Sequence, residues 1–163
     1  MKQLFITFTF LILSISVMAQ TTAESYNRLT DETVGTLCHA AKEKSAQMGL
    51  DISFAICDAD GLPRLFCRFG DALVLSTILV PAKAYTAAIT QTSTEDLAPL
   101  VADGGNLMGI NTTSDKITLV PGGLPLFRKG KIVGAIGVGG GTKDQDLEIA
   151  NFIVAKFNEM NAE

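Results

Sequence analysis

Histidine, tryptophan and cysteine are all scarce in this sequence, and their scarcity limits the chemistry that it can perform. The 163 residues include one histidine, His39, three cysteines and no tryptophan. With one imidazole per chain, a metal site built from several histidines is excluded, and a Ser-His-Asp triad could use only His39. No acidic pair stands out as a general acid and base. The sequence therefore shows no catalytic constellation of its own.

Positive charge is also in short supply. The sequence has 13 Lys and Arg residues and 17 Asp and Glu residues, which gives a formal charge of −4. Proteins that bind nucleic acids usually carry a basic face, and Lys and Arg do not cluster here outside short turns. The sequence therefore predicts no nucleic-acid partner, and the mild acidity is typical of an ordinary solvated surface.

Nucleotide-binding motifs are incomplete as well. The glycine-rich segment 134–143 invites such a reading, but a P-loop requires Gly-Lys-Ser/Thr, and here Thr142 precedes Lys143. A dinucleotide pattern beginning at Gly137 has Thr142 where its last glycine should stand. These glycines are better explained by close backbone approach and by a turn from a strand into a helix.

The three cysteines are Cys38, Cys57 and Cys67, so at least one is unpaired in a monomer. Cys57 and Cys67 flank a predicted hairpin whose tight turn does not place them opposite each other, and a disulfide between them is not favoured. Cys38 falls on an apolar helix face, where a small buried thiol is expected. Cys38-His39 lacks the first cysteine of the covalent haem motif C-x-x-C-H, because Gly35 occupies that position.

The first 19 residues differ from the rest of the chain. Lys2 is followed by an apolar run from Leu4 to Val17, and Ala19 provides a small residue at a cleavage position. The run is shorter than the roughly 20 apolar residues of a membrane-spanning helix. We predict a signal peptide over 1–19, cleavage near Ala19, and export to the periplasm or medium. Residues 20–163 are then a single domain without a membrane span.

Hydrophobic periodicity in that domain predicts an α/β (α+β) fold. The expected helices are Asp31–Met48, a stretch with Pro81 near its start, Thr94–Ala102 and Asp144–Met160. The expected strands are Ile52–Ile56, Leu62–Phe69, Ile117–Val120, Leu124–Phe127 and Ile132–Val138. Two hairpins make antiparallel pairs, so we expect a mainly antiparallel sheet of about five strands with helices packed on it.

Four segments in order carry a resemblance to a known family. They are Ile56-Cys57-Asp58-Ala59-Asp60-Gly61, Lys83-Ala84-Tyr85-Thr86-Ala87, Gly122-Gly123-Leu124-Pro125-Leu126, and Gly130 to Val138 with Asp144-Gln145-Asp146. Together they resemble the GlcG/HbpS family, whose domain also forms the C-terminal part of PduO-type cobalamin adenosyltransferases. The resemblance implies a profilin-like fold and a homo-oligomer. It also implies haem binding in some members, with iron held by a helix histidine, and a secreted branch that acts beside a sensor protein.

The leading hypothesis is thus a secreted or periplasmic binding protein for haem or a related tetrapyrrole. His39 would be the axial ligand of the haem iron, with Lys42 one turn away and Arg64 or Arg68 from the hairpin holding the propionates. The plainer interpretation is that all four are surface residues. Other residues that could ligate the iron are Met48, Met108, Tyr26 and Tyr85, with no basis for choosing among them.

Two alternatives remain open at this stage. The chain could be an enzyme, or an enzyme accessory, acting on a small organic acid or a corrinoid. Its pocket would use Lys83, Thr86, Gly122, Gly123 and Asp146, although a salt bridge for Lys83 and a packing role for Thr86 are the plainer interpretations. The chain could also be an oligomeric interaction module without any ligand.

Overall fold

The computed structural model describes residues 28–162 of the chain. The helices are α2 (Asp31–Gln47), α3 (Ser76–Thr90), α4 (Thr94–Val101), the short 3-10 helix η1 (Ile110–Thr112) and α5 (Lys143–Met160). The strands are β1 (Ser53–Asp58), β2 (Pro63–Arg68), β3 (Gly123–Arg128) and β4 (Lys131–Gly139). The predicted signal peptide and Tyr26 lie outside the described residues.

The four strands form one antiparallel sheet in the order β2-β1-β4-β3. The two hairpins β1–β2 and β3–β4 meet through the pairing of β1 with β4, in which Phe54 lies opposite Val138. The central strands β1 and β4 are almost continuously buried, whereas β2 has no fully buried residue. The outer strands each contain a proline, Pro63 in β2 and Pro125 in β3.

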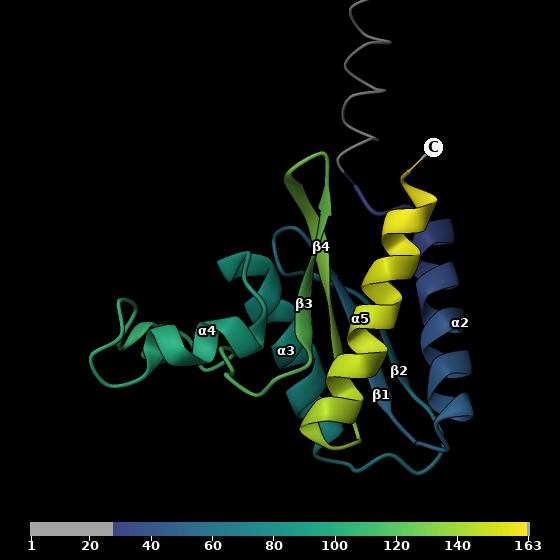
Figure 1. Ribbon diagram of the computed structural model, residues 1–163, viewed down its shortest axis with the longest axis horizontal. Helices are drawn as coiled ribbons and strands as arrows, with labels where there is room; N and C mark the ends of the chain where they lie inside the picture. Colours follow the sequence, from purple (N-terminus) through teal and green to yellow (C-terminus); the bar gives the residue numbers. More distant parts are fainter. Residues whose placement is uncertain (1–27, 163) are drawn as a thin grey trace, which may run out of the picture.

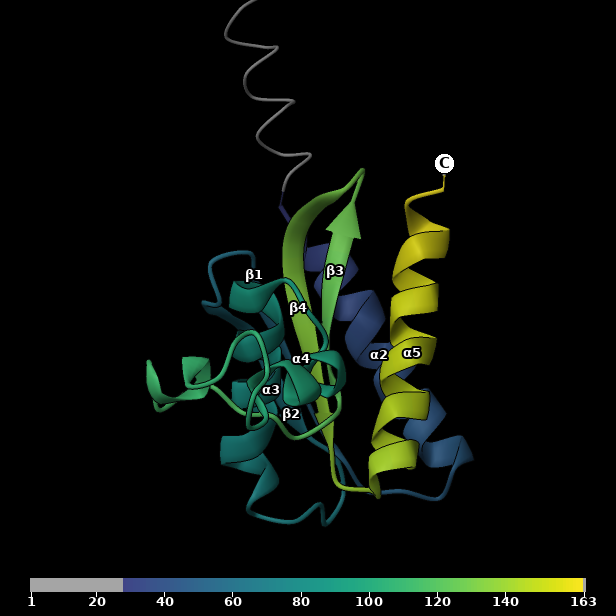
Figure 2. The same cartoon turned by 60° about the vertical axis from the view of Figure 1, so that its left-hand side comes forward.

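Helices cover both faces of this sheet. Figure 1 shows α2 and α5 side by side on one face and α3 with α4 on the other, and Figure 2 shows the same layers from a second direction. Under α2 and α5 lies the larger core, which includes Phe54, Ile136 and Phe157. The α3 face is packed by small residues such as Ala84 and Ala135. The predicted class, an antiparallel sheet with packed helices, is confirmed.

The predicted fifth strand, Ile117–Val120, is wrong, because this segment has no strand structure. Its backbone instead bonds to side chains: the Thr118 N–H donates to Thr86 Oγ1 at 2.9 Å, and the Val120 N–H donates to Thr118 Oγ1 at 3.3 Å. Because side chains already accept hydrogen bonds from these backbone N–H groups, pairing with a sheet edge would add no hydrogen bonds for them. It runs over α3 and leads into β3 instead.

The start of α3 also differs from the prediction. The helix begins at Ser76, so Pro81 lies within it rather than near its start. The apolar run before the proline continues the helix, and Val80 at its end is fully buried against the sheet. Gly137 of β4 permits this close packing, because a Cβ there would collide with the backbone carbonyl of Val80.

Helix ends follow the sequence closely. Thr30 caps α2, Ser93 caps α4, and Thr142 with Gln145 forms a capping box on α5. At the C-terminus of α2, Gly49 follows the cap residue Met48 and takes a positive φ of 65°, which is typical of glycine at this position. The capping box of Thr142 and Gln145 fixes the position at which α5 begins, and this part of α5 forms one wall of the candidate site.

Candidate functional site

A cavity of about 250 Å³ lies between the start of α3 and the start of α5. Its apolar wall comes from α3 and the segment before β3, and its polar wall from the β4–α5 turn. The lining residues are Leu73, Leu75, Ser76, Leu79, Lys83, Val120, Pro121, Gly139, Gly140, Gly141, Lys143 and Asp146. It is smaller than the roughly 300–1,000 Å³ of sites for drug-sized ligands. It could enclose a small organic molecule but not a macrocycle.

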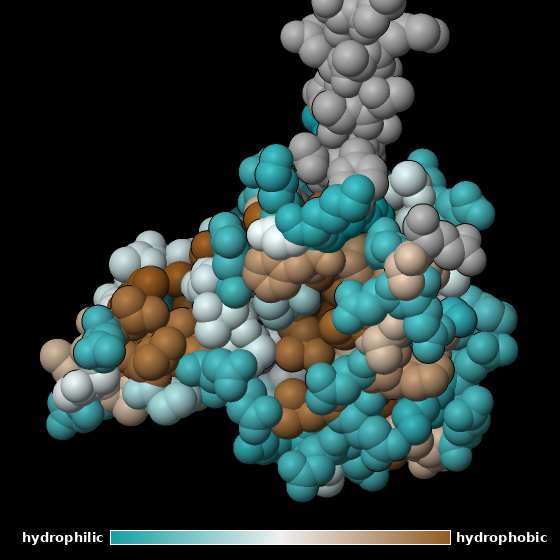
Figure 3. Space-filling model, turned by 45° about the horizontal axis from the view of Figure 1, so that its top comes forward, coloured by the Kyte–Doolittle hydropathy of each residue, from teal (hydrophilic) through white to brown (hydrophobic). Residues whose placement is uncertain are grey.

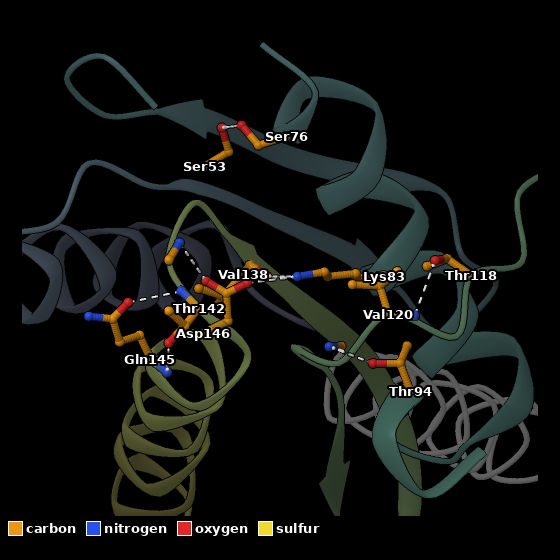
Figure 4. Close-up of polar contacts among 12 residues, drawn as sticks. Ser53, Ser76, Lys83, Thr94, Thr118, Val120, Val138, Thr142, Gln145 and Asp146 are labelled. Carbon is orange, nitrogen blue, oxygen red and sulfur yellow. Dashed lines mark hydrogen bonds and ion pairs between the residues drawn. The ribbon is translucent and has the colours of Figure 1, made fainter. Parts of the chain in front are cut away.

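Lys83 is the most unusual residue of this cavity, since its side chain is only 1% exposed. Its ammonium donates to the Asp146 carboxylate at 2.9 Å and to the Val138 carbonyl at 2.6 Å (Figure 4). The pair therefore joins α3, β4 and α5 at one point. A buried lysine without such partners would lose its charge or unfold the site.

Asp146 is placed by the beginning of α5. It lies one residue after the capping box, where its other carboxylate oxygen accepts from the Gly141 N–H at 3.0 Å. Burial raises the pKa of this carboxyl above its usual range, and this effect outweighs the hydrogen bond and charge of Lys83, which lower the pKa.

Gly122 makes room for the Lys83 ammonium. A Cβ at this position would lie 3.0 Å from Lys83 Nζ, and its φ of 114° disfavours any residue with a side chain. The next residue, Gly123, donates its N–H to Thr94 Oγ1 at 3.0 Å and lies against the backbone of Lys83. The structure thus brings four of the five residues predicted for the second pocket close to one another, but of these only Lys83 and Asp146 line the cavity, and Gly122 and Gly123 pack behind Lys83.

The fifth, Thr86, lies one turn further along α3 and does not line the cavity. Its hydroxyl is fully buried, accepts from the Thr118 N–H and donates to the Lys116 carbonyl at 3.4 Å. Thr86 therefore holds the segment before β3, which supports the plainer interpretation of a packing hydroxyl.

The residues predicted to hold haem lie elsewhere. His39 is on the outer face of α2, 72% exposed, with its Nε2 at 3.2 Å from a Glu43 carboxylate oxygen. Lys42, one turn on, is also exposed. Arg64 donates to the Leu29 carbonyl and to Asp31. Arg68 donates to the Ala72 carbonyl at 2.7 Å.

Among the described residues, no hydrogen bond or ion pair joins these four side chains to one another. Arg64 lines a second depression of about 440 Å³ at the β1–β2 turn, together with Arg28, Asp58 and Asp60. Neither His39 nor Lys42 lines either cavity. Of the other candidate ligands, Met48 packs on the core, Met108 is exposed, and the Tyr85 ring lies 5.6 Å from the Lys116 ammonium.

Two features were not predicted. One is the apolar segment Leu73–Leu79 that forms a wall of the cavity; its dense run of Leu and Val was the available signal. The other is a contact at 3.4 Å between the Cys38 and Cys67 sulfurs, from α2 and β2. Cys57 and Cys67 lie on opposite faces of the sheet, so the pairing that was not favoured from sequence is excluded by geometry.

Within residues 28–162, no helix is both long and apolar enough to cross a membrane. Hydrophobic side chains do gather on the surface: Figure 3 shows them on the projecting part formed by α4 and the segment after it. Exposed residues there include Leu100, Leu107 and Met108.

Comparison with known proteins gives consistent matches. A family model described as haem degrading protein HbpS-like matches residues 29–155. The corrinoid adenosyltransferase PduO of Salmonella typhimurium is 35% identical over 123 residues, which are 75% of this chain and 37% of that protein. The chain thus spans well under half the length of this relative.

Two solved structures share the fold. The structure described as a PduOC:Heme complex is 33% identical with a TM-score of 0.75, covering 78% of this chain and 94% of that one. A crystal structure of HbpS is 28% identical with a TM-score of 0.72, covering 79% and 89%. The family resemblance drawn from the four segments is confirmed.

Proposed function

Because the chain belongs to the HbpS-like family of haem-degrading proteins, we propose that it binds haem or a related tetrapyrrole. The observation that carries this proposal in the chain itself is His39. It is the one imidazole of the sequence, and it stands exposed on α2 rather than serving the core. A lone, accessible imidazole suits axial ligation of iron.

The surroundings of His39 fit a flat ligand on one side. Side chains on a helix lean toward its N-terminus, so the turn that precedes His39 borders the space in which a ligand of the imidazole would lie. That turn holds Gly35, where an added Cβ would meet nothing within 4 Å. Glu43 is the partner of His39 at 3.2 Å, in an exposed contact that a stronger ligand can displace. Lys42 lies one turn away, where its ammonium can attract a propionate.

Bound haem would supply an iron centre for redox or oxygen chemistry. The residues of the chain would hold it: His39 through Nε2, Lys42 through its charge. An open surface covers one face of a macrocycle, so a second surface must cover the other. We include self-association in the proposal, because a second chain can bring such a surface to His39 and because the apolar side chains Leu73, Val74, Leu75 and Ile78, on the other side of the sheet from His39, are 65–74% exposed. Export, supported by residues 1–19, and a sensor partner remain parts of this proposal.

The test is a titration of haemin into purified protein, followed by absorbance. The wild type should give a saturable shift of the Soret band, and His39→Ala should lose it or move it. Gln47→Ala, an exposed substitution on the same helix, is the matched control and should behave as wild type. A titration of the wild type without saturable shift would refute the proposal, and an unchanged His39→Ala spectrum would refute His39 as the ligand.

A second candidate function is binding of a small organic acid in the Lys83 cavity. The observation that favours it is a buried ammonium in the wall of a cavity of about 250 Å³. Thermal denaturation with small carboxylic acids tests it: a saturable rise in Tm should disappear in the cavity-filling variant Leu79→Phe. Haemin binding should not change in that variant, which separates the two functions.

A further inference from the structure

Cys38 and Cys67 are brought together by the fold, not by the sequence. They are 29 residues apart, one on α2 and one on β2, and their sulfurs lie 3.4 Å from each other. Both side chains are half-buried, so the pair is within reach of a reagent in solution. Cys57 differs in each respect, since it is 3% exposed and its thiol donates to the Ala135 carbonyl on the α3 face.

From this geometry we infer that Cys38 and Cys67 are a modification site that oxidises to a disulfide, fastening α2 to the outer strand β2 and leaving Cys57 as the free thiol. A disulfide bond is about 2.05 Å long, so the sulfurs must approach by a little over 1 Å, which small rotations of both side chains can supply. The proposal does not depend on haem binding, and its test requires no haem.

The reaction balances as thiol–disulfide exchange with a donor disulfide, either oxidised glutathione or a dithiol oxidoreductase. One thiolate of the pair attacks the donor and forms a mixed disulfide with one of its sulfurs, which breaks the donor S–S bond and releases the first donor sulfur as a thiol. The second thiolate then displaces the other donor sulfur and forms the Cys38–Cys67 bond. Two electrons and two protons pass from the cysteines to the donor, which leaves as two thiols.

The local environment sets the rate of this exchange. Burial, together with the neighbouring Cys67, raises the pKa of the Cys38 thiol to about 11, while Lys42 lowers it. The thiolate is therefore scarce at neutral pH, and uncatalysed exchange should be slow and should accelerate as the pH rises.

A disulfide to α2 would strengthen the attachment of the edge strand β2 to the rest of the fold. Among the strands that the structure describes, β2 pairs only with β1, and no residue of β2 is fully buried. The exposed edge strand is thus held by one ladder and by its contacts with α2 and α3. A covalent link there closes a loop of the unfolded chain that contains β1 and the whole first hairpin turn.

The experiment equilibrates the full-length protein with reduced and oxidised glutathione at defined ratios. The thiols are then blocked with an alkylating reagent in denaturant and counted by mass spectrometry, followed by non-reducing peptide mapping. The wild type should lose two thiols per chain together, with one peptide joining Cys38 to Cys67. Cys57→Ala should lose the same two thiols, and Cys38→Ser and Cys67→Ser should form no bridge within the chain.

Stability gives an independent readout. The oxidised wild type and oxidised Cys57→Ala should both melt roughly 5–10 °C above their reduced forms. Cys38→Ser should show no such dependence on redox state. Three free thiols in fully oxidising buffer, a bridge that includes Cys57, or bridges only between chains would each overturn the inference.

Discussion

Replacing Lys83 with methionine should be among the most damaging single substitutions in this protein. Methionine fills a similar volume but removes the ammonium, and Asp146 then remains buried with the Gly141 N–H as its remaining donor among the described residues. Breaking a buried ion pair by removing one partner typically costs about 3–5 kcal/mol of unfolding free energy. The two side chains are 1% and 7% exposed, so water cannot compensate. We expect a loss in that range at pH 7.

The loss should shrink in acid. In the wild type, burial already raises the pKa of Asp146 against the lowering effect of Lys83. Without Lys83 that pKa should rise further. The folded state then binds a proton more tightly than the unfolded state, so the variant loses stability as the pH rises from about 4 to 7. Acidification protonates the carboxyl and removes the uncompensated charge.

The double variant Lys83→Met/Asp146→Asn isolates this effect. Asparagine keeps an oxygen that can accept from the Gly141 N–H but carries no charge. The double variant should therefore be more stable than Lys83→Met alone at pH 7, by roughly 1–3 kcal/mol, despite its additional change. Only the single variant should show the steep pH dependence.

Urea denaturation followed by circular dichroism measures all three proteins at pH 7.0 and 4.5, because the chain has no tryptophan for fluorescence. A cost of Lys83→Met below about 1 kcal/mol at pH 7 would contradict the reasoning. So would an equal cost at both pH values, since it would mean that Asp146 is solvated or already neutral.

Three further changes test the geometry around this pair and the cysteine contact. Gly122→Ala forces a side chain into a φ of 114° and should cost about 1–3 kcal/mol in urea denaturation; a neutral result would refute the need for glycine there. Thr142→Ala removes the cap of α5 and should cost about 1 kcal/mol, whereas Thr142→Ser should retain most of the stability. Oxidation of the Cys38–Cys67 pair should stabilise by up to about 3.6 kcal/mol for its 29-residue separation, a figure checked by denaturation with and without reductant.

Local features of the fold were predictable because local physics decides them. Thr30, Ser93 and Thr142 cap the helices that the sequence placed after them, and the Asp58–Gly61 turn joins β1 to β2. Errors arose where distant side chains intervene. Ile117–Val120 resembles a strand in isolation, but the Thr86 hydroxyl, far away in sequence, satisfies its backbone.

In the candidate site, too, the sequence predicted local features, and it did not predict contacts between distant residues. Spacing alone does not relate Lys83 to Asp146, which are 63 residues apart, and the family resemblance grouped them. Neither source predicted that Cys38 would contact Cys67, because the packing of α2 on the sheet edge decides it. The position of His39 on α2 was predictable from the sequence. That His39 lines neither cavity was not, because it depends on how the helices pack on the sheet.

The prolines of the outer strands have a consequence for how copies of this chain can assemble. An exposed sheet edge is a template on which another chain can add a strand, and this is a common route to aggregation. Both edges here are interrupted, by Pro63 on one side and Pro125 on the other, and each proline lacks an N–H to offer. Growth of a continuous sheet from molecule to molecule is thereby disfavoured, and helix faces are left as the surfaces through which a closed assembly can form.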